Sequence, residues 1–282
     1  MPRLVTLLLI LVLTISGCAS LPTNGTVVSI PMPDSTAKLA ATAYRPQGNG
    51  PFPLVVVSHG THPTDSERAG YGYWYRSGII ETFVSKGYAV LVPIRRGYGA
   101  TGGTFMESLG KSHCNDPEFY QSGHVAAQDI LAAVRYGASL PYVDKRRILL
   151  AGQSWGGIAS LAAASQRPDG VIAVANMGGG HCGNPVRYPG EPRHPDRMAE
   201  AIGKYAKTIN VPVLWHYAEN DKFFSPNAAR FWFDAFTQNG GKGKLVLQPP
   251  FGSDGHEVFV SWDGVKLWAP AMDQFLSEFA LK

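Results

Sequence analysis

A five-residue motif, Gly-Gln-Ser-Trp-Gly at residues 152–156, constrains the fold of this chain more than any other feature. It follows the short apolar run 148–150 and precedes 158–164, a run of mostly small residues, so the order indicates a strand, a sharp turn and a helix. Glycines two residues before and two after the serine let the backbone turn tightly enough to project the hydroxyl above the strand end. Ser154 is therefore the candidate nucleophile, although short matches also occur in ordinary loops and the rest of the chain must decide.

The composition excludes several other classes of protein. Of 282 residues, 45% are hydrophobic and 16% are charged, which predicts one large core rather than disorder. The formal net charge is +4, but Lys and Arg are scattered along the sequence, and this argues against a nucleic-acid partner. We therefore expect one domain of catalytic size with a mixed, solvated surface.

The first residues differ from the rest of the chain. Arg3 supplies a positive charge, residues 4–15 are nearly all apolar, and small residues follow. This run is too short to cross a bilayer as a helix of a folded protein and is typical of a signal peptide. The sequence therefore divides into a signal peptide at 1–17, a tether at 18–25 and a catalytic domain at 26–282.

Residues 15–18, Ile-Ser-Gly-Cys, resemble a bacterial lipobox. The resemblance implies that the chain is cleaved before Cys18 and that this cysteine carries diacylglycerol. The chain would then be an exported lipoprotein anchored to a membrane. Because Ala19 is not acidic, similarity to the sorting pattern of Gram-negative lipoproteins points to the outer membrane. An ordinary secretory signal that contains a cysteine is the alternative.

Strand and helix patterns alternate along the mature chain. Unbroken β-branched runs indicate strands buried on both faces, and apolar residues at helical spacing indicate helices. We expect strands at 26–30, 38–44, 54–57, 89–92, 148–150, 170–174, 211–216 and 244–247, and helices at 73–86, 125–136, 158–164, 195–207, 227–238 and 268–279. This order predicts an α/β fold with a doubly wound, mostly parallel sheet. The Gly/Pro-rich residues 178–210 predict a small loop and helix insertion over the active site.

Two loops offer partners for the candidate nucleophile. Ligands of such a sheet bind beyond the carboxyl ends of its strands, and loops there contain Asp221 and His256. The order Ser154, Asp221, His256 is the one expected of α/β-hydrolases. His256 can accept the serine proton near neutral pH, and Asp221 can hold the imidazole tautomer and stabilise the imidazolium. Glu219 and Asp254 are rival carboxylates, but Asp221 lies deeper in its loop and Asp254 is very close to His256 in sequence.

Backbone N–H groups are the candidates for binding the oxyanion. One belongs to Trp155, at the start of the helix after the nucleophile, and the other to Thr61, in the loop after the buried strand 54–57. His59 lies in the same loop, and we expect it to shape the loop rather than to act as a base.

Cys114 and Cys182 remain once the lipobox cysteine is set aside, and an exported protein meets an oxidising compartment. We expect one disulfide between them that staples two loops at the rim of the pocket, with two separate thiols as the alternative. No metal or organic cofactor is indicated, because the histidines occur without convergent cysteine or carboxylate spacing.

Several stretches resemble the dienelactone hydrolase-like branch of the α/β-hydrolases. They are residues 51–60, 143–157, 218–221 and 255–256. The enzymes that name the branch carry a cysteine nucleophile, whereas this chain has Ser154, so the resemblance implies a general serine esterase rather than a dienelactone substrate. Residues 96–99, Arg-Gly-Tyr-Gly, also resemble the catalytic domains of prolyl oligopeptidase-type peptidases, and no propeller sequence accompanies them.

These patterns together predict a serine hydrolase that forms an acyl-enzyme. We expect a carboxylesterase that acts on small or medium ester substrates and is held at a membrane by its lipid anchor. A prolyl oligopeptidase-like peptidase is one alternative, and a non-catalytic binding lipoprotein is another. An activity-based label on the serine separates the enzymes from the binding protein, and a comparison of esters with amides separates the two enzymes.

Overall fold

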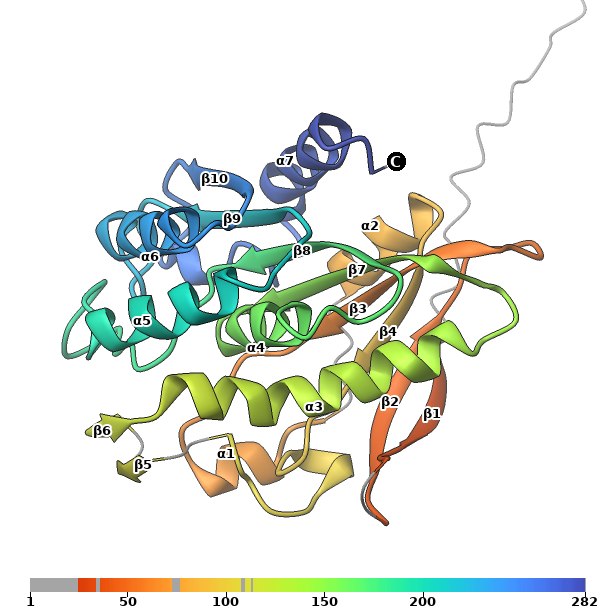
Figure 1. Ribbon diagram of the computed structural model, residues 1–282, viewed down its shortest axis with the longest axis horizontal. Helices are drawn as coiled ribbons and strands as arrows, with labels where there is room; N and C mark the ends of the chain where they lie inside the picture. The colour runs from red at the N-terminus through yellow and green to blue at the C-terminus, as the bar shows by residue number, and fades with distance from the viewer. Residues whose placement is uncertain (1–24, 34–35, 73–76, 108–109, 113, 282) are drawn as a thin grey trace, which may run out of the picture.

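The structure is a computed structural model that describes residues 25–33, 36–72, 77–107, 110–112 and 114–281. Its centre is a sheet of eight strands in the order β1-β2-β4-β3-β7-β8-β9-β10 (Figure 1). Only the pairs β1·β2 and β2·β4 are antiparallel. The strands are β1 (Thr26–Pro31), β2 (Lys38–Tyr44), β3 (Phe52–Ser58), β4 (Ala89–Pro93), β7 (Val143–Gln153), β8 (Val171–Met177), β9 (Val213–Ala218) and β10 (Gly243–Gln248). The predicted mostly parallel sheet is confirmed.

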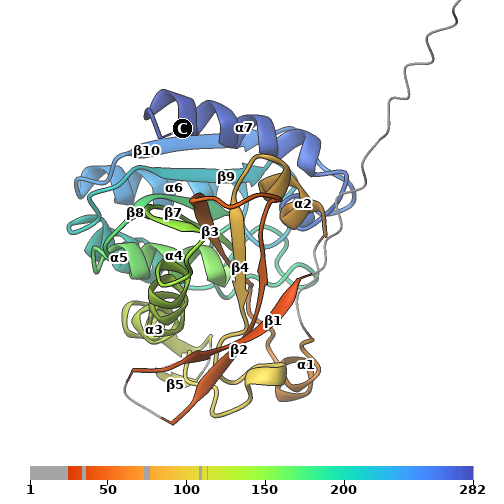
Figure 2. The ribbon, with the colours of Figure 1, turned by 90° about the vertical axis from the view of Figure 1, so that its right-hand side faces the viewer.

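Helices cover both faces of the sheet (Figures 1 and 2). One face packs against four helices and the other against two, which makes the sheet doubly wound as predicted. The first group is α3 (Phe119–Ala138), α4 (Trp155–Ala164), α5 (Pro195–Ala206) and α6 (Pro226–Gln238), and the second is α2 (Ser77–Ser85) and α7 (Val265–Glu278).

Successive side chains of the central strands belong to two separate hydrophobic cores, one on each face of the sheet. In β3, Leu54 and Val56 belong to the core beneath the four-helix face, whereas Val55 and Val57 belong to the core beneath α2 and α7. Successive side chains of a strand point to opposite faces, so a strand buried on both faces needs an apolar residue at every position. This explains why the sequence shows an unbroken apolar run there.

Strand register brings the candidate site residues to one edge. Ser58 pairs with Gly152 across β3 and β7. The turn after β3 that carries Thr61, which we call the oxyanion turn, and the turn at Ser154 therefore leave the sheet at the same level. On the other side of β7, Gln153 pairs with Met177. Because these strands are parallel, the loops that follow them meet at the carboxyl edge.

The insertion at residues 178–210 has two parts with different positions. Its helix α5 lies in the layer formed by α3, α4 and α6, where Met198 and Ile202 are buried. The hydroxyl of Tyr205 in the same helix shares its one hydrogen between the carbonyls of Tyr120, at 2.7 Å, and Phe119, at 3.2 Å, at the start of α3. The helix is therefore part of the core layer, and the loop before it is the part that approaches the active site.

Several short elements occur where the sequence predicted only loops. They are α1 (Asp65–Ala69), β5 (Gly110–Ser112), β6 (Asp116–Pro117) and two 3-10 turns, η1 (Gly99–Thr101) and η2 (Gly255–Glu257). The helix predicted over 73–86 is α2, described from Ser77 onward, and α3 starts at Phe119 rather than at 125. None of these differences alters the order of the sheet.

The predicted signal peptide, the lipidated Cys18 and almost all of the tether lie outside the described residues. Among the helices that the structure does describe, none has both the length and the apolarity needed to cross a membrane.

Candidate active site

Ser154 occupies a sharp turn between the end of β7 and the start of α4. Its backbone has φ 57° and ψ −127°, a strained conformation for a residue with a side chain. Glycine is required on both sides, because a β-carbon at Gly152 would lie 2.1 Å from the Gly156 carbonyl oxygen and one at Gly156 would lie 2.4 Å from the His59 carbonyl oxygen. The motif therefore builds the strand, turn and helix that project the serine.

His256 and Asp221 lie together beside this turn. The imidazole Nδ1 of His256 donates a hydrogen bond to Asp221 Oδ2 at 2.9 Å, since a carboxylate can only accept. Asp221 Oδ1 accepts the backbone N–H groups of Phe223 at 2.8 Å and Phe224 at 2.9 Å, which fix the carboxylate. Both His256 and Asp221 are buried. This arrangement leaves His256 Nε2 as the basic nitrogen.

The rival carboxylates have other partners. Asp254 Oδ1 accepts the backbone N–H groups of Lys222 and His256, each at 3.0 Å, and so holds together the two loops that carry the pair. Glu219 is exposed, and its backbone N–H bonds to the Gln248 carbonyl. The structure thus pairs His256 with Asp221 through the imidazole.

The environment of His256 raises its pKa. Burial lowers the pKa of this imidazole, but the negative charge of Asp221 and the hydrogen bond to it outweigh burial, so the pKa lies above 6.5. The rings of Phe223, with centroids 4.3 Å away, and Phe224, 5.3 Å away, enclose the imidazole. These rings pack against the imidazole and limit its rotation.

Ser154 and His256 line the same cavity, which has a volume of about 600 Å³. Gly60 and Thr61, from the turn after β3, form another part of its wall. A volume of this size is in the range of ordinary small-molecule sites. Nucleophile, base and predicted oxyanion turn therefore face one common space.

The oxyanion turn approaches the nucleophile closely. A β-carbon at Gly60 would lie 2.8 Å from Gln153 Oε1 and 3.2 Å from Ser154 Cβ, so any larger residue here would force these neighbours to shift. The Trp155 N–H is the first of α4, and helix N-terminal N–H groups have no partner within the helix. The positions of Thr61 and Trp155 are thus compatible with two donors that face one oxyanion, and their catalytic role stays a prediction.

His59 is held as a neutral residue. Its Nε2 accepts the Arg95 backbone N–H at 3.1 Å, and its Nδ1 donates to the Gly60 carbonyl at 2.7 Å. Burial, and then the charge of Arg95, hold the pKa of His59 well below its usual value. Both ring nitrogens are engaged in the turn, so the histidine shapes the loop, as the sequence predicts.

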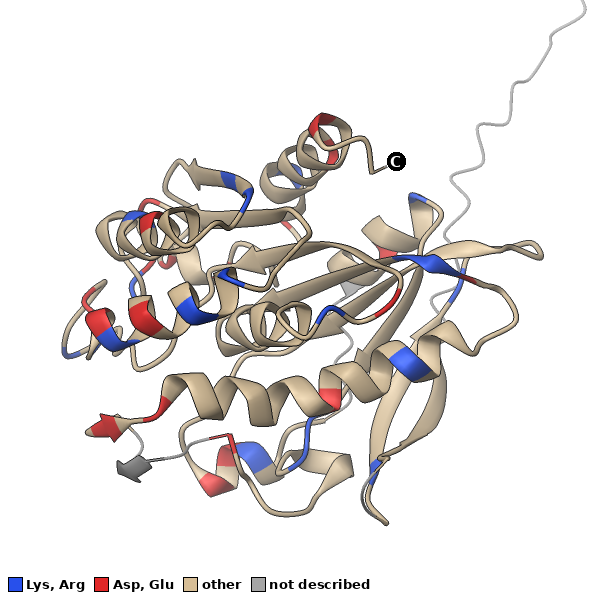
Figure 3. Cartoon of the chain, viewed as in Figure 1, with Lys and Arg blue, Asp and Glu red and all other residues tan. Residues whose placement is uncertain are grey.

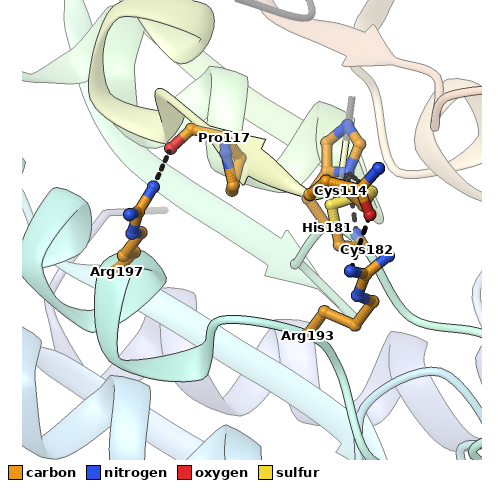
Figure 4. Close-up of a disulfide and its surroundings, with 7 residues drawn as sticks. Cys114, Pro117, His181, Cys182, Arg193 and Arg197 are labelled. Carbon is orange, nitrogen blue, oxygen red and sulfur yellow. Dashed lines mark hydrogen bonds between the residues drawn. A yellow bond between two sulfur atoms is a disulfide. The ribbon is translucent and has the colours of Figure 1, made fainter. Parts of the chain in front are cut away.

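The predicted disulfide is present. Cys114 and Cys182 are joined with an S–S distance of 2.05 Å, and both residues line the cavity (Figure 4). The bridge ties the loop before β6 to the insertion that follows β8. Arg193, from the same insertion, lies beside the bridge and donates to Asn115 Oδ1 at 2.7 Å. The cross-link therefore forms one wall of the cavity.

His181 lies close to both sulfurs, a convergence that sequence spacing did not reveal. Its Nδ1 is 3.9 Å from Cys114 Sγ and 3.2 Å from Cys182 Sγ. The same nitrogen accepts the Cys182 backbone N–H at 2.7 Å. The sulfurs are bonded to each other and are not thiolates, which are the form that binds metals. We therefore interpret His181 and the two cysteines as a structural part of the cavity wall rather than as a metal site.

The comparison with known families decides the assignment of the chain. Its sequence matches the prolyl oligopeptidase family over residues 73–279, well over half of its length. The chain belongs to the prolyl oligopeptidase family. The match includes Ser154, Asp221 and His256, whereas the oxyanion turn precedes it. This family corresponds to the resemblance noted at residues 96–99, and the dienelactone hydrolase-like branch stays a prediction.

Individual relatives of this prolyl oligopeptidase family member differ in name and length. The quorum-quenching protein AidA of Acinetobacter baumannii is 31% identical over 129 residues, which are 45% of this chain and 36% of AidA. The acylaminoacyl peptidase structure of Pyrococcus horikoshii covers 92% of this chain and 42% of its own, with a TM-score of 0.64 and 18% identity. An esterase of Pyrococcus furiosus covers 99% of this chain and 96% of its own, with a TM-score of 0.62 and 14% identity. The chain thus spans less than half of AidA and of the peptidase.

These likenesses show that this family member has the α/β-hydrolase fold. Esterases and peptidases both occur among the similar structures, so they do not separate the two substrate classes.

Sequence reasoning missed an ion pair behind the oxyanion turn. Arg95 follows β4, is completely buried and pairs with Glu107, which is 3% exposed. The sequence signal available was an arginine two residues beyond the end of a strand that is buried at every position. A charge in that place needs a buried partner, but the sequence does not say which acidic residue supplies it.

Proposed function

We propose that this protein is a serine hydrolase, and specifically a carboxylesterase that cleaves small or medium acyl esters. The observation that carries the proposal is the convergence of the Ser154 turn and the Asp221–His256 pair on one cavity of about 600 Å³. A cavity of that size accommodates a ligand of modest length. The disulfide-linked loop that forms one wall is held in place rather than free to open widely.

The proposed reaction follows from the roles of the three side chains. His256 Nε2 removes the proton from the Ser154 hydroxyl as the oxygen attacks the ester carbonyl. Asp221 keeps the other imidazole nitrogen protonated and stabilises the imidazolium. The tetrahedral intermediate then collapses: the bond to the alcohol breaks, and His256 gives its proton to the departing oxygen. Water, activated by the same imidazole, hydrolyses the acyl-enzyme and releases the acid.

Backbone donors stabilise the intermediate in this proposal. The negative charge that develops on the carbonyl oxygen is bound by the N–H groups of Thr61 and Trp155. Such donors are fixed before the reaction and need no reorganisation when the charge appears. Removing one of them typically lowers turnover by about 10² to 10³.

A peptidase is the second candidate, and the family match favours it. Both reactions use the same nucleophile and base, but an amide nitrogen must be protonated before it can leave, whereas an ester oxygen leaves more easily. Protonation therefore demands a closer fit between the leaving group and His256. Relative rates on matched substrates distinguish the two candidates.

The test compares kcat/KM for p-nitrophenyl esters of increasing acyl length with kcat/KM for a matched set of dipeptide p-nitroanilides. We expect short and medium esters to react fastest, with no activation at an oil–water interface. Ser154→Ala, assayed in parallel, corrects for background hydrolysis. Faster cleavage of the anilides would move the peptidase into first place, and a preference for long acyl chains would indicate a lipase.

We also propose that Cys18 carries a lipid that holds the enzyme at a membrane. The proposal is supported by the lipobox-like residues 15–18 and by the apolar run that precedes them. The lipid would place the catalytic domain beside the bilayer without a spanning helix.

A further inference from the structure

Arg95 uses its entire hydrogen-bonding capacity behind the oxyanion turn. Its Nη1 donates to Ser58 Oγ at 2.8 Å and to the His59 carbonyl at 2.6 Å. Its Nη2 donates to the Gly60 carbonyl at 3.2 Å and to Glu107 Oε2 at 3.1 Å, and its Nε donates to Glu107 Oε1. A guanidinium has five N–H donors, and each has an acceptor here. Three of these acceptors belong to residues 58–60, at the end of β3 and in the turn that follows it, and two belong to Glu107.

The Gly60–Thr61 peptide connects this network to the cavity. A trans peptide unit is planar, and its C=O and N–H groups point in opposite directions. The Gly60 carbonyl points inward, where it accepts from Arg95 and from His59 Nδ1. The Thr61 N–H therefore points away from the buried guanidinium and toward the cavity that Gly60 and Thr61 line. Arg95 thus fixes the direction of the predicted oxyanion donor without touching the cavity.

Glu107 holds the guanidinium in this orientation. It accepts two N–H groups side by side, a geometry in which the guanidinium plane cannot rotate. Tyr98 reinforces the turn from the same side, because its hydroxyl lies 2.8 Å from Thr61 Oγ1 and 3.5 Å from Glu107 Oε2. The residue that carries the donor N–H is therefore held through both its backbone and its side chain.

We propose that Arg95, oriented by Glu107, is a positioning residue that aims the Thr61 N–H at the oxyanion. This inference rests on the proposed function, in which Thr61 supplies that donor. A lysine at position 95 can keep the charge but not the planar fork, so it cannot hold two successive carbonyls and a carboxylate together. The role is transition-state alignment, and it leaves substrate binding intact.

The variants separate alignment from folding. Arg95→Lys keeps the charge, and Glu107→Gln keeps the shape of its partner. A buried charge left unpaired can unfold a protein, so the double variant Arg95→Met/Glu107→Met removes both charges at similar volume. Arg96→Lys is the matched control, because the neighbouring Arg96 pairs with Asp129 rather than with the turn. Circular dichroism melting identifies the variants that fold.

Two readouts report the oxyanion directly. Steady-state kinetics on a p-nitrophenyl ester give kcat and KM separately. Inhibition by an acyl trifluoromethyl ketone, which forms a tetrahedral adduct with the nucleophile, is compared with inhibition by the corresponding alcohol, which cannot. We expect Arg95→Lys and the double variant to lower kcat by about 10-fold to 100-fold, because a misaimed donor costs less than the 10² to 10³ lost with a deleted one. KM and alcohol binding stay within about twofold, and ketone binding weakens with kcat.

Wild-type kcat and ketone affinity in either folded Arg95 variant, with Ser154→Ala inactive, would overturn the positioning role alone. An equal loss in Arg96→Lys, or a loss confined to KM, would also overturn it. Wild-type turnover by Ser154→Ala would instead refute the proposed function and, with it, the inference.

Discussion

The imidazole of His256 is held by Asp221 at Nδ1, and this fixed tautomer determines what the site can do. Asp221 fixes the protonated nitrogen, and two backbone N–H groups fix Asp221. Because a base must be neutral to accept a proton, and because Asp221 raises the pKa of His256, we expect kcat/KM to fall as the pH drops through a pKa above 6.5. A pH–rate profile on a soluble ester measures this limb.

Two carboxylate variants check the cause of that limb. Asp221→Asn removes the charge that raises the pKa of His256, so the acid limb moves to lower pH, and kcat falls by about 10⁴ because the wrong tautomer is favoured. Asp254→Asn is the matched control, because Asp254 accepts backbone N–H groups, does not bond to the ring and raises the pKa of His256 less than Asp221 does. A profile that shifts equally in both variants would contradict the pairing.

At the scale of elements, the Cys114–Cys182 bridge joins two loops that are 68 residues apart in sequence. In the chain-entropy model, a loop of that length contributes about 4 kcal/mol to the free energy of unfolding. We expect the double variant Cys114→Ser/Cys182→Ser to lose a similar amount in urea unfolding under non-reducing conditions. Addition of a dithiol should destabilise the wild type and leave the variant unchanged.

An unchanged stability of the double serine variant would show what else holds the wall of the cavity. If the double serine variant were as stable as the wild type, the two loops would be held by their other contacts, such as the hydrogen bond between Arg193 and Asn115. The bridge would then contribute nothing measurable to the free energy of unfolding.

The sequence predicted elements well where one pattern controls them. The unbroken apolar run in β3 indicates a strand buried on both faces, and the glycines around Ser154 permit the tight turn that the structure shows. Other elements depend on partners that are distant in sequence, as with α5, whose burial requires three other helices. The short helix α1 had a readable signal, since Thr64 and Glu67 form a capping box at its start.

The site residues also divide into those that a sequence pattern predicts and those that depend on a partner distant in sequence. Chain order predicted Ser154, Asp221 and His256 as partners, because parallel strands bring their following loops to one edge. It could not predict that Arg95 would use Glu107 as its partner, since nothing local relates an arginine after β4 to that glutamate. The contact of His181 with both cysteines is likewise created by the disulfide between two distant loops.

At the scale of the whole molecule, acidic and basic residues are interspersed over the chain (Figure 3). The lipobox-like residues 15–18 are the reason that we expect Cys18 to anchor the protein at a membrane. Cys18→Ser should lose metabolic labelling with palmitate and move from the membrane fraction to the soluble fraction. Unaltered labelling and fractionation would point to a different anchor.

The central claim is that Ser154 forms an acyl-enzyme in an α/β-hydrolase of the prolyl oligopeptidase family. The most direct measurement is intact-mass spectrometry of the protein quenched in acid during turnover of a p-nitrophenyl ester, followed by peptide mapping. We predict a mass increase of one acyl group, located on Ser154 and absent from Ser154→Ala. An acyl group on another residue, or the same increase in Ser154→Ala, would contradict the claim.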